Sequence, residues 1–220
     1  MPHRVRVWDL PTRLFHWLLA ICVVALVVTA KVGGNATAWH ARLGLAVLAL
    51  LLFRLVWGFI GGRWSRFRSF VYAPATLKSY LAGRAHPDHL VGHNPIGAGS
   101  VFAMLAVLLA QAATGLFTDD DAGFTGPLNP FVSTARGLAL TSYHRSVGQW
   151  LVLALVALHI AAIVFYERRK RQALVRPMIT GDKELAHPAP SARDDAASRT
   201  VAAAVALACA GLVSWIARLG

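Results

Sequence analysis

Charge is scarce in this chain, and acidic charge is the scarcest. Only 15% of the 220 residues are charged, and 22 Lys and Arg stand against 10 Asp and Glu. A soluble domain typically has about 25% charged residues, whereas long charge-free runs are typical of membrane-spanning helices. With 56% hydrophobic residues and a mean hydropathy of +0.53, the composition excludes an ordinary soluble domain and indicates an integral helical membrane protein.

Cysteine is nearly absent as well. The two cysteines, Cys22 and Cys209, lie in apolar runs, and neither belongs to a CxxC or CxxCH motif. Their placement argues against covalent haem attachment, a thiolate zinc site and a disulfide framework, and we expect both to be small buried side chains. The sequence also lacks a P-loop and a GxGxxG motif in a strand–turn–helix context, which argues against ATP, nicotinamide and flavin chemistry in this chain.

Apolar runs of bilayer length predict five membrane spans. The first run contains no small-residue cleavage site, so we interpret it as a retained span and not as a signal peptide. The predicted fold is an all-α membrane protein with five spans, of which the fifth is C-terminal, Ala-rich and short. The predicted spans are roughly Leu14–Ala30, Ala41–Ile60, Ala98–Thr118, Ser146–Tyr166 and Val201–Ala217.

The basic residues of the loops predict the orientation. Sixteen of the 22 lie in the N-terminus, the loop after the second span and the segment after the fourth. Five lie on the opposite side, namely Lys31, Arg42, Arg136, Arg145 and Arg218. The positive-inside rule therefore places the N-terminus of this multi-pass protein in the cytoplasm and its C-terminus outside it. The net charge of +12 is thus a topology signal, and no nucleic-acid partner is expected.

Four histidines stand within or at the ends of these apolar segments, where an imidazole is costly unless it has a partner. With the predicted orientation, His16 and His159 lie toward the cytoplasmic side, and His40 and His144 lie at the outer side. His144 and His159 are 15 residues apart, about 22 Å along a helix, and share one broad face. Because histidines at the same depth in the membrane can face each other, these positions predict two pairs, His16 with His159 and His40 with His144.

Two histidines facing each other between membrane helices suit a six-coordinate haem iron. Both axial positions are then filled, which favours outer-sphere electron transfer over oxygen or substrate binding. A zinc ion would more often have four ligands in tetrahedral geometry. We therefore predict two bis-histidine haem b groups, an outer one at His40/His144 and an inner one at His16/His159.

Two glycines and one arginine accompany the histidines. Gly44 follows His40 by four residues and Gly148 follows His144 by four, which leaves space for a macrocycle on each ligand's own face; close packing of helices is the alternative. Arg54 lies about 21 Å beyond His40 along the second span. Its guanidinium either pairs with haem propionates or extends to the cytoplasmic surface.

A loop between the second and third spans holds three more histidines. His86, His89 and His93 follow an HxxHxxxH spacing, which permits a metal site, although the surrounding Pro and Gly residues favour an irregular solvated loop. Tyr80 and Asn94, together with His93, could also border a quinone headgroup. On the other side of the membrane, the acidic run 119–121 is either a solvated turn or a docking surface for a basic partner.

Several sequence motifs resemble the bacterial cytochrome b561 family, and in particular the branch related to the b-type cytochrome subunit of nickel–iron hydrogenase. The resemblance covers roughly residues 5–181, and its motifs are VWDLPTRLFHW, WHARLG, LLFRLVWGF, GHNPIG, HRSVGQW and LVRPMITG. It implies a four-helix bundle with two b-type haems. It also implies ligands on the first, second and fourth spans, which fall on His16, His40, His144 and His159.

The resemblance implies electron transfer between a redox partner and the membrane quinone pool. We expect a di-haem cytochrome domain at 1–181, a flexible polar linker at 182–199 and a C-terminal transmembrane helix at 200–220. The expected partners are membrane lipid, quinone and a periplasmic cytochrome c or a dehydrogenase or hydrogenase subunit. One alternative is a self-sufficient superoxide:quinone oxidoreductase, and another is a proton or metal transporter that uses the intramembrane His and Arg.

Overall fold

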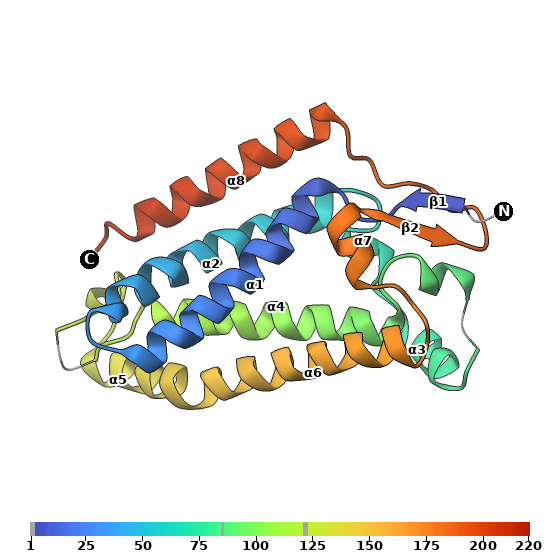
Figure 1. Cartoon of the computed structure of the whole chain (residues 1–220). Helices are drawn as coiled ribbons and strands as arrows, with labels where there is room; N and C mark the ends of the chain where they lie inside the picture. The colour runs from blue at the N-terminus through green and yellow to red at the C-terminus, as the bar shows by residue number, and fades with distance from the viewer. Residues whose placement is uncertain (1–2, 85, 121–122) are drawn as a thin grey trace. The chain divides into compact units, whose positions relative to one another are not determined.

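The computed structural model describes the chain except for residues 1–2, 85 and 121–122 (Figure 1). Five segments of the described chain are helical, long and apolar enough to cross a membrane. They contain α1 (Leu10–Val32), α2 (Ala36–Ile60), α4 (Pro95–Gly115), α6 (Gln149–Arg168) and α8 (Ala196–Ile216). The predicted class, a helical membrane bundle with a fifth C-terminal span, is confirmed.

Three of the long helices, α1, α4 and α8, begin a few residues before their predicted spans, where a polar side chain caps the first turn. The Asp9 carboxylate precedes α1 and accepts the backbone N–H of Thr12 at 2.8 Å. The Asn94 side chain precedes α4 and accepts the N–H of Gly97 at 2.7 Å. Asp195 caps α8 in the same way. Each cap satisfies a backbone donor that the first helical turn leaves open.

The fourth span is longer than predicted and changes its helical geometry near its start. It begins with α5 (Thr134–Tyr143), continues through a π-helical turn, η4 (His144–Gly148), and ends with α6. The expected span from Ser146 therefore omitted α5 and began inside the π-turn. Such turns insert an extra residue into a helix and occur frequently at functional sites.

A two-stranded sheet joins the N-terminus to the segment after the fourth span. Strand β1 (His3–Arg6) pairs antiparallel with β2 (Asp182–Leu185), with His3 opposite Leu185 and Arg6 opposite Asp182. Beyond β2, the Ala192 N–H donates to the Arg6 carbonyl at 2.7 Å. The segment expected as a flexible polar linker, 182–199, thus includes a strand and backbone hydrogen bonds to the N-terminus, which satisfy some of its polar backbone groups.

Shorter elements complete the secondary structure. They are the 3-10 turns η1 (Phe67–Ser69), η2 (Pro87–Leu90) and η3 (Asn129–Phe131), and the helices α3 (Pro74–Leu81) and α7 (Val175–Thr180). Gly33 and Gly34 form the turn between α1 and α2 with φ values of 65° and 54°, in the left-handed region that favours glycine.

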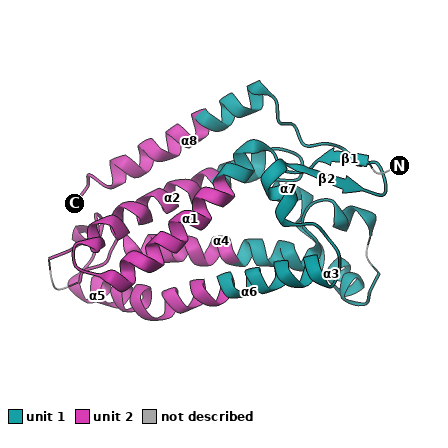
Figure 2. Cartoon of the chain, viewed as in Figure 1, with its two compact units in different colours: residues 1–14, 54–103, 156–203 teal, residues 15–53, 104–155, 204–220 magenta. Residues whose placement is uncertain are grey.

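The chain divides into two compact units, each built from several segments (Figure 2). Unit 1 contains residues 1–14, 54–103 and 156–203, and unit 2 contains residues 15–53, 104–155 and 204–220. Unit 1 includes the sheet and a buried cluster around it, formed by Val5, Val7, Trp8, Trp64, Val91, Leu185 and Ala192. Unit 2 includes most of α1 and α2, the second half of α4, and α5.

Candidate functional site

His40 and His144 lie together in unit 2. Their ring centroids are 6.1 Å apart and the ring planes are nearly perpendicular, at 85°. Residues 104 positions apart in the chain thus present their imidazoles to each other from α2 and from the π-turn η4. The depth argument predicted this juxtaposition.

Each of these rings is held by a backbone carbonyl of a neighbouring helix. The Nδ1 of His40 lies 3.0 Å from the Leu26 carbonyl oxygen, and the Nδ1 of His144 lies 3.0 Å from that of Gln111. A carbonyl can only accept, so each Nδ1 carries the proton and each Nε2 keeps its lone pair. Within the described part of the chain neither Nε2 forms a hydrogen bond, and both are available to a metal.

A threonine hydroxyl accompanies each carbonyl. Thr29 Oγ1 lies 3.3 Å from the Nδ1 of His40, and Thr114 Oγ1 lies 3.3 Å from the Nδ1 of His144. Both hydroxyls also contact the carbonyl four residues earlier in their helix at 2.8 Å, which fixes their rotamers. The same carbonyl–threonine support occurs on both sides, and such partners orient metal-binding imidazoles.

The spacing of the two rings suits a shared axial metal. A metal–imidazole bond is about 2 Å long, and the ligating nitrogen lies roughly 1.1 Å from the centre of its ring. Two imidazoles on opposite sides of one ion therefore have centroids about 6 Å apart, as seen for His40 and His144. The donor set, two neutral imidazoles between apolar helices, fits haem iron.

The glycines differ in what surrounds them. A Cβ added at Gly44 would meet no atom within 4 Å, so open space lies beside this turn of α2. A Cβ at Gly148 would come within 1.8 Å of the Gln111 side-chain oxygen, so that side chain occupies the space. Gly115 makes room for the His144 ring itself, whose Cε1 would lie 3.1 Å from an added Cβ. Roles of Gly44 and Gly148 in cofactor binding stay predictions.

Arg54 is buried in unit 1, with an exposed fraction of 3%. Its guanidinium stacks on the Phe67 ring at 4.7 Å and interacts with the charge of Asp9. Its Nη1 is buried and has no hydrogen-bond partner within the described residues. A buried donor without an acceptor is costly, and a haem propionate would supply the missing acceptor.

The remaining two predicted ligands belong to different units. His16 lies in unit 2, where its ring meets the edge of Trp17 at 5.1 Å. His159 lies on α6 in unit 1 and is partly buried. Their pairing stays a prediction.

The three loop histidines have separate environments. The ring centroids of His86 and His89 are 5.9 Å apart, whereas the His93 ring packs at a tilt against Trp8 and Phe70, with centroid distances of 4.8 Å and 4.5 Å. No three His, Cys, Asp or Glu side chains converge as a metal site in the described parts of the chain. The HxxHxxxH spacing therefore does not bring the three rings together.

The groups considered for a quinone headgroup are engaged elsewhere. The Asn94 amide caps α4, and the Tyr80 hydroxyl lies 3.4 Å from that of Tyr166. In the acidic run, Asp120 accepts the Phe124 N–H at 2.8 Å, as expected for a turn, while Asp121 lies outside the described residues.

Sequence reasoning missed the groups that orient the ligands. Thr29, Thr114 and Gly115 have no motif around them, and the carbonyls of Leu26 and Gln111 have no sequence signal at all. Thr29 is 11 residues before His40, and its hydroxyl comes close to the His40 ring only because the turn between α1 and α2 brings the two helices together. Asp9 was also missed, although it lies in the conspicuous motif VWDLPTRLFHW.

Membrane helices that present paired histidines with free Nε2 atoms define a class, the membrane-bound b-type cytochromes. Comparison with known families makes the class specific: the model of the prokaryotic cytochrome b561 family matches residues 7–181. The chain belongs to this family. It is therefore a multi-pass haem protein of membrane electron transport.

Curated relatives agree with this assignment. The chain is 26% identical to the probable Ni/Fe-hydrogenase 1 B-type cytochrome subunit of Escherichia coli (strain K12), over 80% of this chain and 88% of that protein. It is 25% identical to the probable Ni/Fe-hydrogenase B-type cytochrome subunit of Rhizobium leguminosarum bv. viciae (81% and 88% covered) and 24% identical to that of Rhodobacter capsulatus (81% and 81%). No solved structure matches.

Proposed function

We propose that this chain is a di-haem cytochrome that transfers electrons across the bacterial inner membrane, between a redox partner on the periplasmic side and the quinone pool. The N-terminus lies in the cytoplasm, as the distribution of basic residues predicts. Family membership supports the electron-transfer role. The observation that carries the proposal is the pair His40 and His144, with its 6.1 Å ring separation and its two carbonyl-held Nδ1 atoms.

His40 and His144 hold the outer haem b through their Nε2 atoms. The carbonyls of Leu26 and Gln111 keep each ring in the tautomer that can bind iron, and they raise its basicity. The open space at Gly44 leaves room for a flat macrocycle beside α2. When bound, haem b would supply a one-electron redox couple, and these two imidazoles would hold its iron.

His16 and His159 hold the inner haem, and Arg54 binds its propionates. The support is the predicted depth of the two histidines and the buried, unpartnered Nη1 of Arg54. Its positive charge then stabilises the reduced iron, since nearby cations disfavour the additional charge of the oxidised state.

The partner on the periplasmic side is a hydrogenase or a similar dehydrogenase. Curated relatives that the chain resembles over four fifths of its length are named as Ni/Fe-hydrogenase cytochrome subunits, which supports this choice. The second candidate is a superoxide:quinone oxidoreductase that needs no protein partner. The apolar surroundings and the pairing of His40 with His144 disfavour the third, a transporter, which would be colourless.

The test is haem stoichiometry combined with a redox titration of the purified full-length protein. Two haem b per chain and two resolved midpoint potentials are expected, with reduction by hydrogenase in membranes. A pyridine haemochrome assay without haem b would contradict the proposal. Rapid quinone-dependent oxidation of superoxide by the isolated protein would favour the second candidate.

A further inference from the structure

Unit 1 contains a cavity lined by three arginines that the haem sites do not use. We call it the arginine cavity, after Arg63, Arg66 and Arg68. It has a volume of about 450 Å³, and Tyr72 and His89 also line it. This volume is in the range of cavities that hold small ligands.

The arginines of this cavity form no ion pair with the described residues. The one acidic side chain among the described lining residues, Asp88, is 63% exposed and lies 3.6 Å from the His86 ring. The cavity therefore has a net positive charge that an anion would compensate.

Arg66 is the least satisfied of the three. Its Nε is buried and has no hydrogen-bond partner among the described residues. Burial, together with the positive charges of Arg68 and Arg63, lowers the pKa of its guanidinium. The neighbouring hydroxyls donate elsewhere, Ser69 to the Arg66 carbonyl and Tyr72 to the His93 carbonyl, each at 2.7 Å, and neither accepts a hydrogen bond from the Arg66 Nε.

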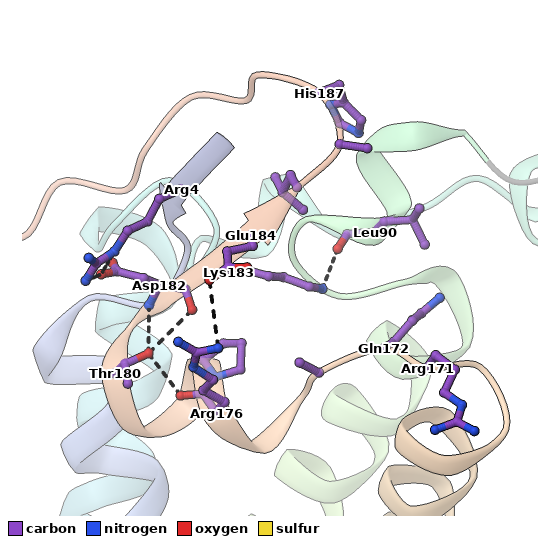
Figure 3. A pocket seen from close by; sticks show the side chains of 14 residues that line it. Arg4, Leu90, Arg171, Gln172, Arg176, Thr180, Asp182, Lys183, Glu184 and His187 are labelled. Carbon is purple, nitrogen blue, oxygen red and sulfur yellow. Dashed lines mark hydrogen bonds and ion pairs between the residues drawn. The ribbon is translucent and has the colours of Figure 1, made fainter. Parts of the chain in front are cut away.

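A second cavity of unit 1 shows the contrast (Figure 3). It has a similar volume, about 460 Å³, and is also lined by basic side chains. There, however, Arg4 pairs with Asp182 at 2.5 Å, Arg176 lies 3.8 Å from Glu184, and Lys183 donates to the Leu90 carbonyl. The protein itself supplies acceptors to these cations, whereas the described residues supply none to the Arg66 Nε.

Exposed apolar side chains lie close in sequence to the arginines of the cavity. Phe59, at the end of α2, is 73% exposed and contacts the ring of Phe67, which lies between Arg66 and Arg68. Val71 is 65% exposed. A phosphate group attached to acyl chains would satisfy both the guanidinium groups and this apolar surface.

We propose that the arginine cavity binds a phosphate group, and that its source is the headgroup of an anionic phospholipid. The planar guanidinium of Arg66 binds the phosphate oxygens, while Arg63 and Arg68 add charge from the cavity wall. The exposed apolar side chains contact the acyl chains. Basic sites on the cytoplasmic side of membrane proteins bind anionic headgroups by this chemistry. This site is independent of the haem ligands.

Lipid retention by the full-length protein tests the proposal. The protein is purified in detergent, delipidated and titrated with phosphatidylglycerol or phosphatidylcholine, and bound lipid is counted by native mass spectrometry. We expect the wild type to bind phosphatidylglycerol preferentially and Arg66→Gln to bind it about tenfold more weakly. Arg63→Gln should weaken binding less, and Arg66→Lys should fall between Arg66→Gln and wild type because it keeps the charge but loses the planar fork.

Arg84→Gln is the matched control, since it removes the same charge from the same loop at an exposed position that does not line the cavity. It should bind phosphatidylglycerol like the wild type, and an unchanged haem spectrum would show that each variant is folded. Equal losses in Arg66→Gln and Arg84→Gln would overturn the site. Equal binding of the two lipids, or displacement of phosphatidylglycerol by millimolar inorganic phosphate, would overturn the lipid assignment.

Discussion

The paired histidines of unit 2 and the buried Asp9 of unit 1 are satisfied by the protein to different degrees. In unit 2, His40 and His144 each use one ring nitrogen for a helix carbonyl and keep the other free. In unit 1, the fully buried Asp9 accepts from the backbone N–H groups of Thr12 and Gly62 at 2.8 Å and from the side chains of Trp57 and Ser65 at 3.2–3.3 Å. The polar groups of unit 2 are thus prepared for an external ligand, whereas Asp9 is satisfied by the protein.

This difference separates positions that serve the cofactor from positions that serve the fold. Changes to the polar groups of unit 2 should alter haem content and potential with little effect on folding. Changes to Asp9 and its surroundings should alter stability first. The predictions below test this separation, from the largest expected effect to the smallest.

The largest effect is expected at the outer ligands. His40→Ala and His144→Ala should each remove the same haem, because a haem held by two histidines is lost when either histidine is removed. Optical redox titration and haem stoichiometry should then show one remaining component, identical in both variants. His187→Ala, which changes a histidine outside the predicted ligand set, is the control. If the two variants lost different components, the pairing would be wrong.

A large effect on stability is expected at Asp9. Asp9→Asn keeps the size of the side chain but presents an amide to groups that donate, and it removes the negative charge that compensates Arg54. We expect a loss of about 3 kcal/mol, as found when one partner of a buried charge pair is removed. Thermal unfolding in detergent measures it, with Asp88→Asn as an exposed control in the same unit. Equal thermal midpoints for these two variants would contradict the structural role.

A smaller effect concerns pH and Lys183. Burial lowers the pKa of its ammonium from 10.5 to about 8. The unfolded chain therefore binds more protons between these two values, and the contribution of Lys183 to stability rises with pH through that window. Solvent screening limits the gain to about 1 kcal/mol. In Lys183→Met the thermal midpoint should no longer rise with pH between about 8 and 10.5, whereas in the exposed Lys78→Met it should rise as in the wild type. The same dependence of the thermal midpoint on pH in wild type and Lys183→Met would refute this prediction.

The smallest effect is expected at the threonines of unit 2. Thr29→Val and Thr114→Val remove one of two groups near each Nδ1, while the carbonyl contact remains. We expect loss of the outer haem to be about threefold faster, less than the ten- to hundredfold typical when a ligand's orienting partner is removed. Thr200→Val is the matched control, since its hydroxyl contacts only the carbonyl four residues earlier. Haem transfer to apomyoglobin measures the rate.

Much of the fold could be predicted from the sequence, because the length of an apolar run is a property of consecutive residues. The five spans were predicted, and errors were confined to their ends, where caps such as Asp9 and Asn94 extend the helices beyond the apolar runs. The pairing of β1 with β2 was not predicted. Its strands are four residues long and 176 residues apart, and neither stands out in composition.

The site was readable only in part. The histidines were detectable because an imidazole on an apolar segment is conspicuous, and loop charges gave His40 and His144 the same depth. The groups that orient them were not detectable, because a backbone carbonyl is present at every residue. Gln111 illustrates the limit: its side chain fills the space at Gly148 that the pattern assigned to a cofactor.

The sequence by itself determined the class of the protein, its spans and the four intramembrane histidines, since each follows from the free energy of placing polar groups on apolar segments. Only the tertiary structure decided which nitrogen of His40 and His144 faces a ligand. It also showed that Asp9 is satisfied by the protein and that the Arg66 Nε has no acceptor among the described residues. These outcomes depend on hydrogen bonds between segments that are far apart in the sequence. The partners of such bonds come within reach of each other only when the helices have packed.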